Sequence, residues 1–585
     1  MSFVSVSKKN WLFKEFNSSD IKKLSEDHSV SEIVAKLISI RSKNIQDVNI
    51  FLNPTIKKLL PDPFVLKDMD LATDRTYDSI LKKEIIGIFG DYDVDGATST
   101  ALLSKYFLSI KQNIKTYIPD RKREGYGPSI KGFNELINFG AKIIFTVDCG
   151  TLSFEPVSSA QSKNIDIIVL DHHQSEVKLP RAHAIVNPNR FDDTSNLNYL
   201  CAAGVCFMFL ISLNKKLRNE KWFKKNNIEE PNLLNFLDLV SLGTVCDVVP
   251  LIDLNRAIVK QGLKIIKQRK NLGLKTLYDL CKIETQPNTY HLGYILGPRI
   301  NAGGRVGKSS HGAELLTSND PIRTYRIANE LDKSNKERQS IEQILSETIN
   351  EDVKNFLQDP VLVLSGNNWH EGIIGIIASR IKEKYNKPTI IISLNKSKGK
   401  GSARSVINFD IGTQIINAVQ LGLLEKGGGH KMAGGFTINK DNISLFRDYL
   451  VKNFNKSIAN KSKVVNLYLD CVIAPSALNE KFYDEINFLS PFGSGNNEPK
   501  FVIENIKVIK SNLVGDKHIK SILAGKDGSV FKSIAFNAIN TNLENFLNKD
   551  YKLFFNIAGK MSLNEWKGRK EVEFIIEDIS INQIN

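Results

Sequence analysis

The chain has 585 residues, of which 42% are hydrophobic and 24% charged, so it is long enough for about three to five domains and too apolar for a disordered protein. Its 79 Lys and Arg residues exceed its 64 Asp and Glu residues and leave a formal charge of +15, which favours polyanionic partners. Six cysteines without a CxxC pair argue against a disulfide scaffold or a zinc ribbon. The sequence shows neither a signal peptide nor the ~18–20 apolar residues of a membrane-spanning helix, so we expect a soluble cytoplasmic protein.

Residues 1–75 carry amphipathic helical patterns that are interrupted by Pro54, Pro61 and Pro63. They predict a small helical N-terminal lead-in that packs on the segment that follows it. No chemistry is visible in this part of the sequence.

Residues 76–319 alternate short apolar segments with helical ones, a pattern that predicts a parallel, doubly wound α/β sheet. In such sheets ligands bind beyond the carboxyl ends of the strands. The predicted strands span residues 84–90, 114–119, 141–148, 165–171 and 183–187.

The first of these strands runs into GDYDVDGATS, which places Asp91, Asp93 and Asp95 on alternate positions. One Asp before a helix is commonly a cap, but capping needs only one carboxylate. Three carboxylates this close repel one another unless a cation lies among them. The pattern therefore favours a metal site.

Further polar residues follow later strands. Asp148 ends one strand, Asp171, His172 and His173 follow the next, and Asp247 lies near the end of a helical segment. Each alone is typical of a helix cap or a structural histidine. Together they supply the oxygen and imidazole ligands that suit Mn²⁺ or Mg²⁺, in a number that favours two ions.

Four segments resemble, in order, the motifs of the DHH phosphoesterase family: DYDVDG at 91–96, VDCG at 147–150, DHH at 171–173 and GTVCDVVPL at 243–251. That family includes the RecJ single-strand exonucleases, oligoribonucleases, cyclic-dinucleotide phosphodiesterases and manganese pyrophosphatases. The resemblance implies five metal ligands, with Asp148 bridging two ions: Asp93, Asp95, Asp148, His172 and Asp247. It implies catalytic roles beside the metals for Asp91, Asp171 and His173.

Two positions depart from the usual RecJ pattern, because Cys149 replaces an asparagine and Cys246 an alanine. Neither change removes a ligand. Both place a thiol near the metals, and this predicts sensitivity to oxidation or to thiophilic reagents.

The segment GPRINAGGR, residues 297–305, resembles a RecJ segment in which Asn301 and Arg305 would contact the nucleotide. The alternative is a glycine turn with a surface arginine. Residues 320–358 then predict a long, partly solvated helix that connects two lobes.

The second lobe, residues 359–460, resembles the DHH-associated domain DHHA1. We expect a strand at 360–366, a helix and a strand over 370–392, and a polar turn at 400–406. In GGGHKMAGGF, residues 427–436, glycines expose backbone N–H groups beside cationic side chains, although a loop of no special function has a similar composition. The resemblance implies a substrate-binding role for Ser402, Arg404, Gly428, Gly429 and His430.

Residues 461–585 form short alternating segments that predict a small β-barrel. Within them, SPFGSGNNEPKF at 490–501 resembles the RecJ segment that leads into an OB-like, nucleic-acid-binding domain. The expected fold is thus a parallel doubly wound α/β DHH domain, a second α/β DHH-associated domain joined to it by a long helix, and a C-terminal OB-like β-barrel.

Within the family, the barrel and the basic charge favour a long single strand as substrate, so the RecJ branch is the closest resemblance. It implies a single-stranded-DNA-specific 5′→3′ exonuclease of recombination and repair that releases 5′-mononucleotides with two Mn²⁺ or Mg²⁺ ions. It further implies a monomer supplied by a RecQ-type helicase and a single-strand-binding protein. Two alternatives stay open: a phosphodiesterase for short oligoribonucleotides or linear dinucleotides, and a non-catalytic single-strand-binding scaffold.

Overall fold

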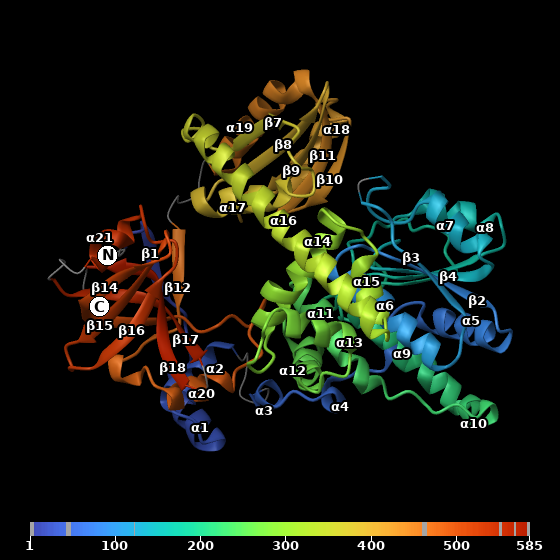
Figure 1. Cartoon of the computed structure of the whole chain (residues 1–585), viewed down its shortest axis with the longest axis horizontal. Helices are drawn as coiled ribbons and strands as arrows, with labels where there is room; N and C mark the ends of the chain where they lie inside the picture. Colours follow the sequence, from blue (N-terminus) through green and yellow to red (C-terminus); the bar gives the residue numbers. More distant parts are fainter. Residues whose placement is uncertain are drawn as a thin grey trace.

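The computed structural model describes residues 5–41, 48–121, 123–458, 465–548, 553–566 and 569–581. Figure 1 shows three bodies: the first sheet with its helices, a second α/β body above it, and a β-barrel beside both. Among the described helices, none is both long and apolar enough to cross a bilayer.

The first body contains a five-stranded parallel sheet in the order β3-β2-β4-β5-β6. All five predicted strands are confirmed within one to two residues at their ends. Four are short runs of largely buried apolar residues, whereas β3, at the edge of the sheet, has no fully buried residue. The strands are β2 (Ile85–Gly90), β3 (Ile114–Tyr117), β4 (Ala141–Val147), β5 (Asp166–Leu170) and β6 (Ala184–Val186).

Helices cover both faces of this sheet, which confirms the doubly wound prediction. The larger core joins one face to α6, α9 and the helices after it, and a smaller core joins the other face to α7 and α8. These helices are α5 (Met69–Leu81), α6 (Val94–Ser109), α7 (Ile130–Asn138), α8 (Phe154–Gln161), α9 (Ala202–Asn219), α10 (Trp222–Asn226), α11 (Leu237–Cys246), α12 (Asp253–Lys267), α13 (Leu272–Leu280), α14 (Gly297–Arg305) and α15 (His311–Thr317).

The predicted connecting helix is α16 (Pro321–Lys354), which is 34 residues long. Asp320 caps it by accepting hydrogen bonds from the N–H groups of Ile322 and Arg323. Pro321 occupies the first turn, where its missing N–H costs nothing. Figure 1 shows α16 running from the first body into the second.

The second body has a mixed sheet in the order β10-β11-β9-β8-β7. The polar turn expected at 400–406 is wrong, because most of these residues belong to a strand, β9. Glycines occupy buried positions of this strand, so the sequence lacks the usual alternation of apolar and polar residues. Gly401 is needed there because a Cβ would lie 2.1 Å from the Phe436 ring. The elements are β7 (Leu362–Asn367), α17 (Ile374–Tyr385), β8 (Thr389–Asn395), β9 (Lys398–Arg404), α18 (Ile411–Gln420), β10 (Lys426–His430), β11 (Ala433–Asn439) and α19 (Ile443–Ile458).

The C-terminal body is a closed five-stranded barrel, as predicted. The order β14-β15-β16-β18-β17 closes through a further pairing of β14 with β17. Its strands are β14 (Phe501–Val514), β15 (His518–Gly525), β16 (Val530–Ala535), β17 (Phe555–Trp566) and β18 (Arg569–Ser580), with β13 (Cys471–Val472) and the helices α20 (Glu480–Asn487) and α21 (Asn542–Leu547) beside them.

The N-terminal segment packs differently from the prediction. Its first strand, β1 (Lys9–Phe13), pairs in parallel with β12 (Val465–Leu469), and α1 (Ser18–His28) and α2 (Glu32–Arg41) contribute to the core of the barrel. Only the part from α4 (Ile56–Leu59) onward packs on the first sheet, as expected for the whole of residues 1–75. Local sequence patterns do not reveal a pairing partner more than 400 residues away.

Trp11 fixes this N-terminal strand to the barrel. Its indole N–H donates to Asp578 Oδ2 at 2.9 Å, and both side chains are buried. We expect Trp11→Phe to lower the free energy of unfolding by ~1.5–3 kcal/mol, because a buried carboxylate loses a donor. Tyr468→Phe, on the adjacent β12 at 55% exposure, should change it by less than ~0.5 kcal/mol. Denaturant unfolding measures both; equal effects would contradict the role given to this hydrogen bond.

Candidate metal centre and nucleic-acid contact surface

The turn after β2 places the first carboxylates. Asp93 caps α6, accepting a hydrogen bond from Gly96 N at 3.0 Å on Oδ1. The helix begins so close to Asp91 that a Cβ on Gly96 would lie 2.6 Å from the Asp91 carbonyl oxygen. Glycine at this position therefore lets the turn bring Asp91 and Asp93 together.

Asp95 lies in the first turn of α6 and faces the start of α9. Its two carboxylate oxygens accept hydrogen bonds from Ala202 N at 2.7 Å and Ala203 N at 2.9 Å. Burial raises the pKa of Asp95, while the charge of His172 and these amides act in the opposite direction. The carboxylate is thus fixed in place while its remaining lone pairs face the cluster.

Three other strand and helix ends deliver the remaining carboxylates. Asp148 follows β4, Asp171 follows β5, and Asp247 ends α11. Asp148 has a φ of 60°, a conformation that is costly for a residue with a side chain and that occurs often at functional sites. The strained turn is consistent with a carboxylate that is aimed at a fixed point.

His172 lies at the centre of this arrangement. Its Nε2 is 3.3 Å from Asp148 Oδ1, 3.6 Å from Asp247 Oδ2 and 3.7 Å from Asp95 Oδ2. This nitrogen is buried and has no hydrogen-bond partner within the part of the chain that the structure describes. A buried nitrogen that faces three carboxylates without a hydrogen bond is the arrangement expected of a shared metal site.

Three overlapping groups of side chains have ligand atoms within 4.8 Å of one another. All five predicted metal ligands lie in them, and Asp148 and His172 each belong to two groups. Asp91, predicted to act beside the metals, lies in a group itself. The groups are Asp95, His172 and Asp247; Asp91, Asp93 and Asp148; and Asp148, His172 and His173.

The carboxylates of this cluster repel one another. Burial and the neighbouring carboxylates raise the pKa of Asp91 and Asp148 well above the ordinary value, and that of Asp247 to about 8. Such a group of oxygens suits a divalent cation, which removes the repulsion that otherwise forces protons onto the site. The donor set of carboxylates and one or two imidazoles therefore fits Mn²⁺ or Mg²⁺.

His173 and Asp171 form an ion pair beside the cluster. Burial opposes the charge of His173, but its 2.8 Å hydrogen bond to Asp171 raises its pKa to about 9. Asp171 is also buried, yet its bonds to His173 and Thr151 lower its pKa. In the metal-free protein this ion pair favours the imidazolium form of His173 at neutral pH.

Two residues that hold this pair, Asn187 and Tyr126, were not predicted from the sequence. Asn187, at the end of β6, donates to the His173 carbonyl at 2.9 Å and to the Thr151 hydroxyl at 2.8 Å. The Tyr126 hydroxyl lies 3.2 Å from His173 Nε2 and donates to the Asp148 carbonyl at 3.1 Å. Asn187 follows a predicted strand, as the aspartates do, and this was its only visible signal.

The surroundings of the two unusual cysteines argue against high reactivity, since Cys149 is buried and Cys246 is partly buried. Burial raises the pKa of both thiols, and they donate to carbonyl oxygens, Cys149 to Val147 and Cys246 to Leu292. A buried thiol that stays protonated is a poor nucleophile. The predicted sensitivity of the site to thiol reagents is therefore not supported.

Asn301 and Arg305 lie on α14, beside the metal cluster. Asn301 Oδ1 accepts a hydrogen bond from Val94 N at 3.1 Å, so it supports the turn that carries the aspartates. Arg305 donates to the Gly372 carbonyl at 2.9 Å and so joins the two α/β bodies. Burial lowers the pKa of Arg305 to about 10, and the nearby Arg121 and Arg338 act in the same direction.

Four of the five residues predicted to bind substrate in the second body lie on one face of its sheet. Across β9, β11 and β10, Ser402 opposes Gly435, which opposes Gly428; Arg404 opposes Ala433, which opposes His430. Paired residues face the same side, so Ser402, Arg404, Gly428 and His430 share a face. Gly429, between Gly428 and His430, faces the other side.

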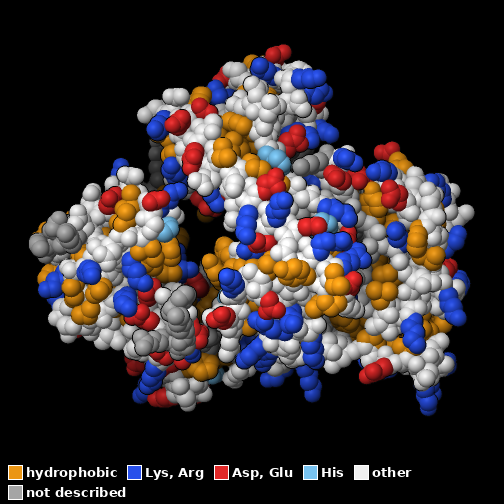
Figure 2. Space-filling model, in the orientation of Figure 1, with side chains coloured by type: hydrophobic (Ala, Val, Ile, Leu, Met, Phe, Trp, Pro, Cys, Tyr) orange, Lys and Arg blue, Asp and Glu red, His pale blue; other side chains and the backbone are white. Residues whose placement is uncertain are grey.

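Helix α17 covers only part of this face. It packs on β7 and β8, and Arg404 donates from Nε to the hydroxyl of Ser379 on α17 at 3.1 Å. Over the hairpin of β10 and β11 the surface stays open, since a Cβ on Gly428 would meet nothing within 4 Å. Bare backbone beside Arg404 and Lys431 favours the approach of an anion. Figure 2 shows Lys and Arg side chains on the visible face where the two bodies meet, and a hollow beside the barrel.

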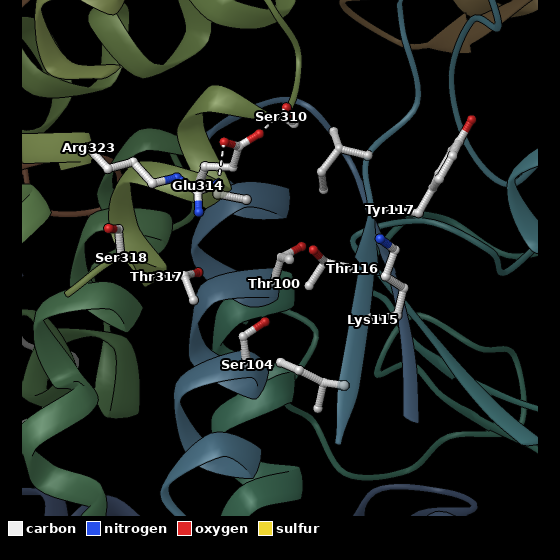
Figure 3. A pocket seen from close by; sticks show the side chains of 13 residues that line it. Thr100, Ser104, Lys115, Thr116, Tyr117, Ser310, Glu314, Thr317, Ser318 and Arg323 are labelled. Carbon is white, nitrogen blue, oxygen red and sulfur yellow. Dashed lines mark hydrogen bonds and ion pairs between the residues drawn. The ribbon is translucent and has the colours of Figure 1, made fainter. Parts of the chain in front are cut away.

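A cavity of about 490 Å³ lies beside β3, an edge strand of the first sheet, between this strand, α6 and α15. Figure 3 shows the side chains of Thr100, Ser104 and Glu314 around it, with Glu314 bonded to Ser310 and Arg323. None of the predicted site residues lines this cavity. It is separate from the metal cluster, although Thr100 lies on the same helix as Asp95.

Three parts of the chain match known families. Residues 85–244 match the DHH family, N-terminal domain; residues 358–456 match the DHHA1 domain; and residues 469–578 match the RecJ OB domain. The single-stranded-DNA-specific exonuclease RecJ of Escherichia coli (strain K12) is 33% identical over 546 residues, which cover 90% of this chain and 92% of that protein. The protein of the same name from Bacillus subtilis is 30% identical over 584 residues, or 99% of this chain and 71% of that protein.

Solved structures agree with the fold. RecJ from Thermus thermophilus in complex with Mn²⁺ superimposes with a TM-score of 0.80 at 24% identity, over 98% of this chain and 80% of that one. An exonuclease RecJ bound to manganese superimposes with a TM-score of 0.58 at 27% identity, over 69% of this chain and 98% of that one.

Metal binding should depend on pH through the raised carboxyl pKa values. A carboxyl whose pKa is higher in the folded state contributes stability below its unfolded value of ~4 and loses it as pH rises through its folded value. For Asp247 this loss proceeds from about pH 4 up to the folded pKa of about 8, and for His173, whose pKa is raised to about 9, it proceeds between about pH 6.5 and 9. The melting temperature of the metal-free protein should therefore fall between pH 6 and 9.

Added Mn²⁺ should reverse this trend, since it binds the deprotonated carboxylates. At a hundred times its Kd it adds about 2.7 kcal/mol. Calorimetry at pH 6, 7.5 and 9 with and without Mn²⁺ measures the effect, and stabilisation that does not grow with pH would contradict a carboxylate site.

Two matched substitutions separate the cluster from its neighbouring ion pair. Asp247→Asn should stabilise the metal-free protein at pH 8.5 by roughly 1 kcal/mol, because it removes a repelling charge, and should weaken the stabilisation by Mn²⁺. Asp171→Asn should destabilise the metal-free protein by ~1.5–3 kcal/mol, because it breaks charge-assisted hydrogen bonds. Effects of the same sign in metal-free unfolding experiments would rule out this assignment.

Proposed function

The chain belongs to the RecJ family of single-stranded-DNA-specific exonucleases, and we propose that it degrades single-stranded DNA in the 5′→3′ direction and releases 5′-mononucleotides. The observation that carries the proposal is one cluster of carboxylates and imidazoles at the carboxyl edge of the first sheet, with arginines and a glycine hairpin nearby. We place this activity in DNA recombination and repair in the cytoplasm. The catalytic chemistry is assigned to residues 76–319.

The metal cluster would hold two Mn²⁺ or Mg²⁺ ions through Asp93, Asp95, Asp148, His172 and Asp247. When bound, the ions supply Lewis acidity for hydrolysis of a phosphodiester. The protein's part is to fix their positions. The amides of Ala202 and Ala203 hold Asp95, and the Asn301 carboxamide holds the turn of Asp93.

His173 acts as a hydrogen-bond donor to the scissile phosphate. Asp171 fixes the ring through Nδ1, and this hydrogen bond raises the pKa of His173 and so favours its protonated form. An imidazolium beside the reacting group stabilises the negative charge that develops there. Asp91, within the same cluster, completes the ligand set or orients the attacking water.

The second body, residues 359–460, would bind the single-stranded DNA on the side opposite the metals. Ser402, Arg404, Gly428 and His430 share its open sheet face, and Arg305 lies at the junction of the two bodies. Arginine suits this task because its planar guanidinium recognises phosphate with two donors. Gly429 faces the opposite side, so its contribution would come from the backbone.

The barrel, residues 461–585, would grip the rest of the single strand. Small barrels of this kind bind single strands through a basic groove and aromatic side chains. We propose that the protein works as a monomer on strands that a RecQ-type helicase opens and a single-strand-binding protein covers.

End-labelled strands test this function. We expect metal-stripped protein with Mn²⁺ restored to release labelled mononucleotide at once from a long single strand labelled at its 5′ end, and only late from one labelled at its 3′ end. His173→Ala should lower kcat by ~10²-fold or more, because one preorganised donor to the developing charge is lost.

Blunt duplex of the same sequence is the control, and it should stay intact. Rapid cleavage of a dinucleotide beside an inert long strand would instead indicate the short-substrate phosphodiesterase. Binding of the strand without metal-dependent cleavage would indicate the non-catalytic scaffold.

A further inference from the structure

The segment that leads into the barrel packs against the catalytic body. We call residues 489–496 the docking segment. The carbonyl oxygen of Ser494 accepts a hydrogen bond from Leu251 N at 2.7 Å, and that of Phe492 accepts one from the Thr289 hydroxyl at 2.7 Å. Both donors belong to the body that carries the metal cluster.

Two glycines permit this close approach. A Cβ on Gly493 would lie 2.7 Å from Leu251 Cδ1, and one on Gly495 would lie 3.1 Å from Pro250 Cβ. Gly495 also has a φ of 72°, which favours glycine. The docking segment is therefore shaped to fit residues 250 and 251.

Arg256, on α12, holds the first part of the docking segment. Its guanidinium donates to the carbonyl oxygens of Leu489 at 2.8 Å, Ser490 at 2.9 Å and Pro491 at 3.2 Å. A further hydrogen bond of 2.8 Å reaches the Phe51 carbonyl at the end of the N-terminal segment. Arg256 thus joins the catalytic body to both chain segments that build the barrel.

Because Arg256 is charged and buried, loss of this contact would be unfavourable. The side chain is 2% exposed, and burial lowers its pKa to about 10. Its partners in the described structure include no carboxylate: four carbonyl oxygens accept its hydrogen bonds, and its guanidinium lies 4.1 Å from the centroid of the Phe51 ring. If the docking segment left, three of these acceptors would leave with it, and a buried cation would stay under-satisfied.

The contact lies close to the metal cluster along the chain. Asp247 ends α11, Val248 has a φ of 61°, and Leu251, which bonds the docking segment, is four residues after Asp247. Asn255, on the same helix as Arg256, donates to the Pro250 carbonyl at 3.0 Å. Residues 248–251 are thus held from α12 on one side and by the docking segment on the other.

We propose that Arg256 is a positioning residue: by seating the docking segment on residues 250 and 251, it fixes Asp247 for metal binding and so couples the docked barrel to the metal centre. The proposal deepens the proposed function, since it takes Asp247 as a metal ligand. It assigns to the docking segment, residues 489–496, a role in the catalytic body in addition to that of a lead-in to the barrel.

Arg256→Met in the full-length protein tests the proposal. Methionine keeps the contact with the Phe51 ring but donates no hydrogen bond. We expect faster hydrogen exchange at the amides of residues 248–251 in the metal-free protein, and a loss of ~10-fold in the weaker Mn²⁺ affinity, as for other residues that orient a ligand. Excess Mn²⁺ should restore kcat to within about twofold, because the ligand itself is intact.

Lys260→Met is the matched control. Lys260 lies one turn further along α12 and donates at 2.6 Å to the Leu52 carbonyl, so it serves the same interface without touching the docking segment. It should leave exchange and Mn²⁺ affinity unchanged. Thr289→Val, which removes only the bond to Phe492, should show a weaker form of the Arg256→Met effect and serves if that variant does not fold.

Unchanged exchange at residues 248–251 and unchanged Mn²⁺ affinity in Arg256→Met would overturn the proposal, as would an equal effect in Lys260→Met. Both readouts are independent of DNA cleavage. If the wild-type protein binds two Mn²⁺ ions but does not cleave single-stranded DNA, the proposed function fails. Hydrogen exchange and Mn²⁺ affinity of Arg256→Met still test whether the docking segment acts on the metal centre.

Discussion

The repulsion among buried carboxylates at the carboxyl ends of the strands of the first sheet is the constraint on which the rest of the structure depends. Burial and mutual proximity raise the pKa of Asp91, Asp95, Asp148 and Asp247. A fold holds such a group only if other contacts enforce it, and here backbone amides, a strained turn and a glycine helix start do so. A divalent cation would relieve this repulsion, so metal affinity follows from the way the fold holds the carboxylates together at the carboxyl ends of the strands.

A complementary positive charge lies across the junction of the two α/β bodies. Arg121, Arg305, Arg338 and Arg404 come from different elements, and the structure places several of them close enough to lower one another's pKa. Each set of charges is unfavourable alone. A phosphodiester backbone is an anion that the arginines attract, and its scissile phosphate meets the cations held by the carboxylates, so one ligand satisfies both halves of the site.

The sequence allowed good prediction wherever a pattern is local. Strands β2, β4, β5 and β6 are short buried runs, and three of them are followed directly by Asp, so both the sheet and most of the metal cluster could be predicted. The strand β9 was missed because glycine fills its buried positions, which removes the apolar alternation. Asn187 and Tyr126 were missed because they act through hydrogen bonds across the fold. The pairing of β1 with β12 joins distant parts of the chain, and no local pattern encodes it.

That pairing has a mechanical consequence. Because β1, α1 and α2 share a core with the barrel, the two ends of the chain form one body, and the catalytic body lies between them in the sequence. Two chain segments therefore connect the barrel body to the catalytic body on this side, one near Phe51 and one at residues 489–496, and Arg256 bonds to both. This buried guanidinium lies on the helix that follows Asp247, so the contact that ties both segments of the barrel body to the catalytic body is close in sequence to the metal cluster.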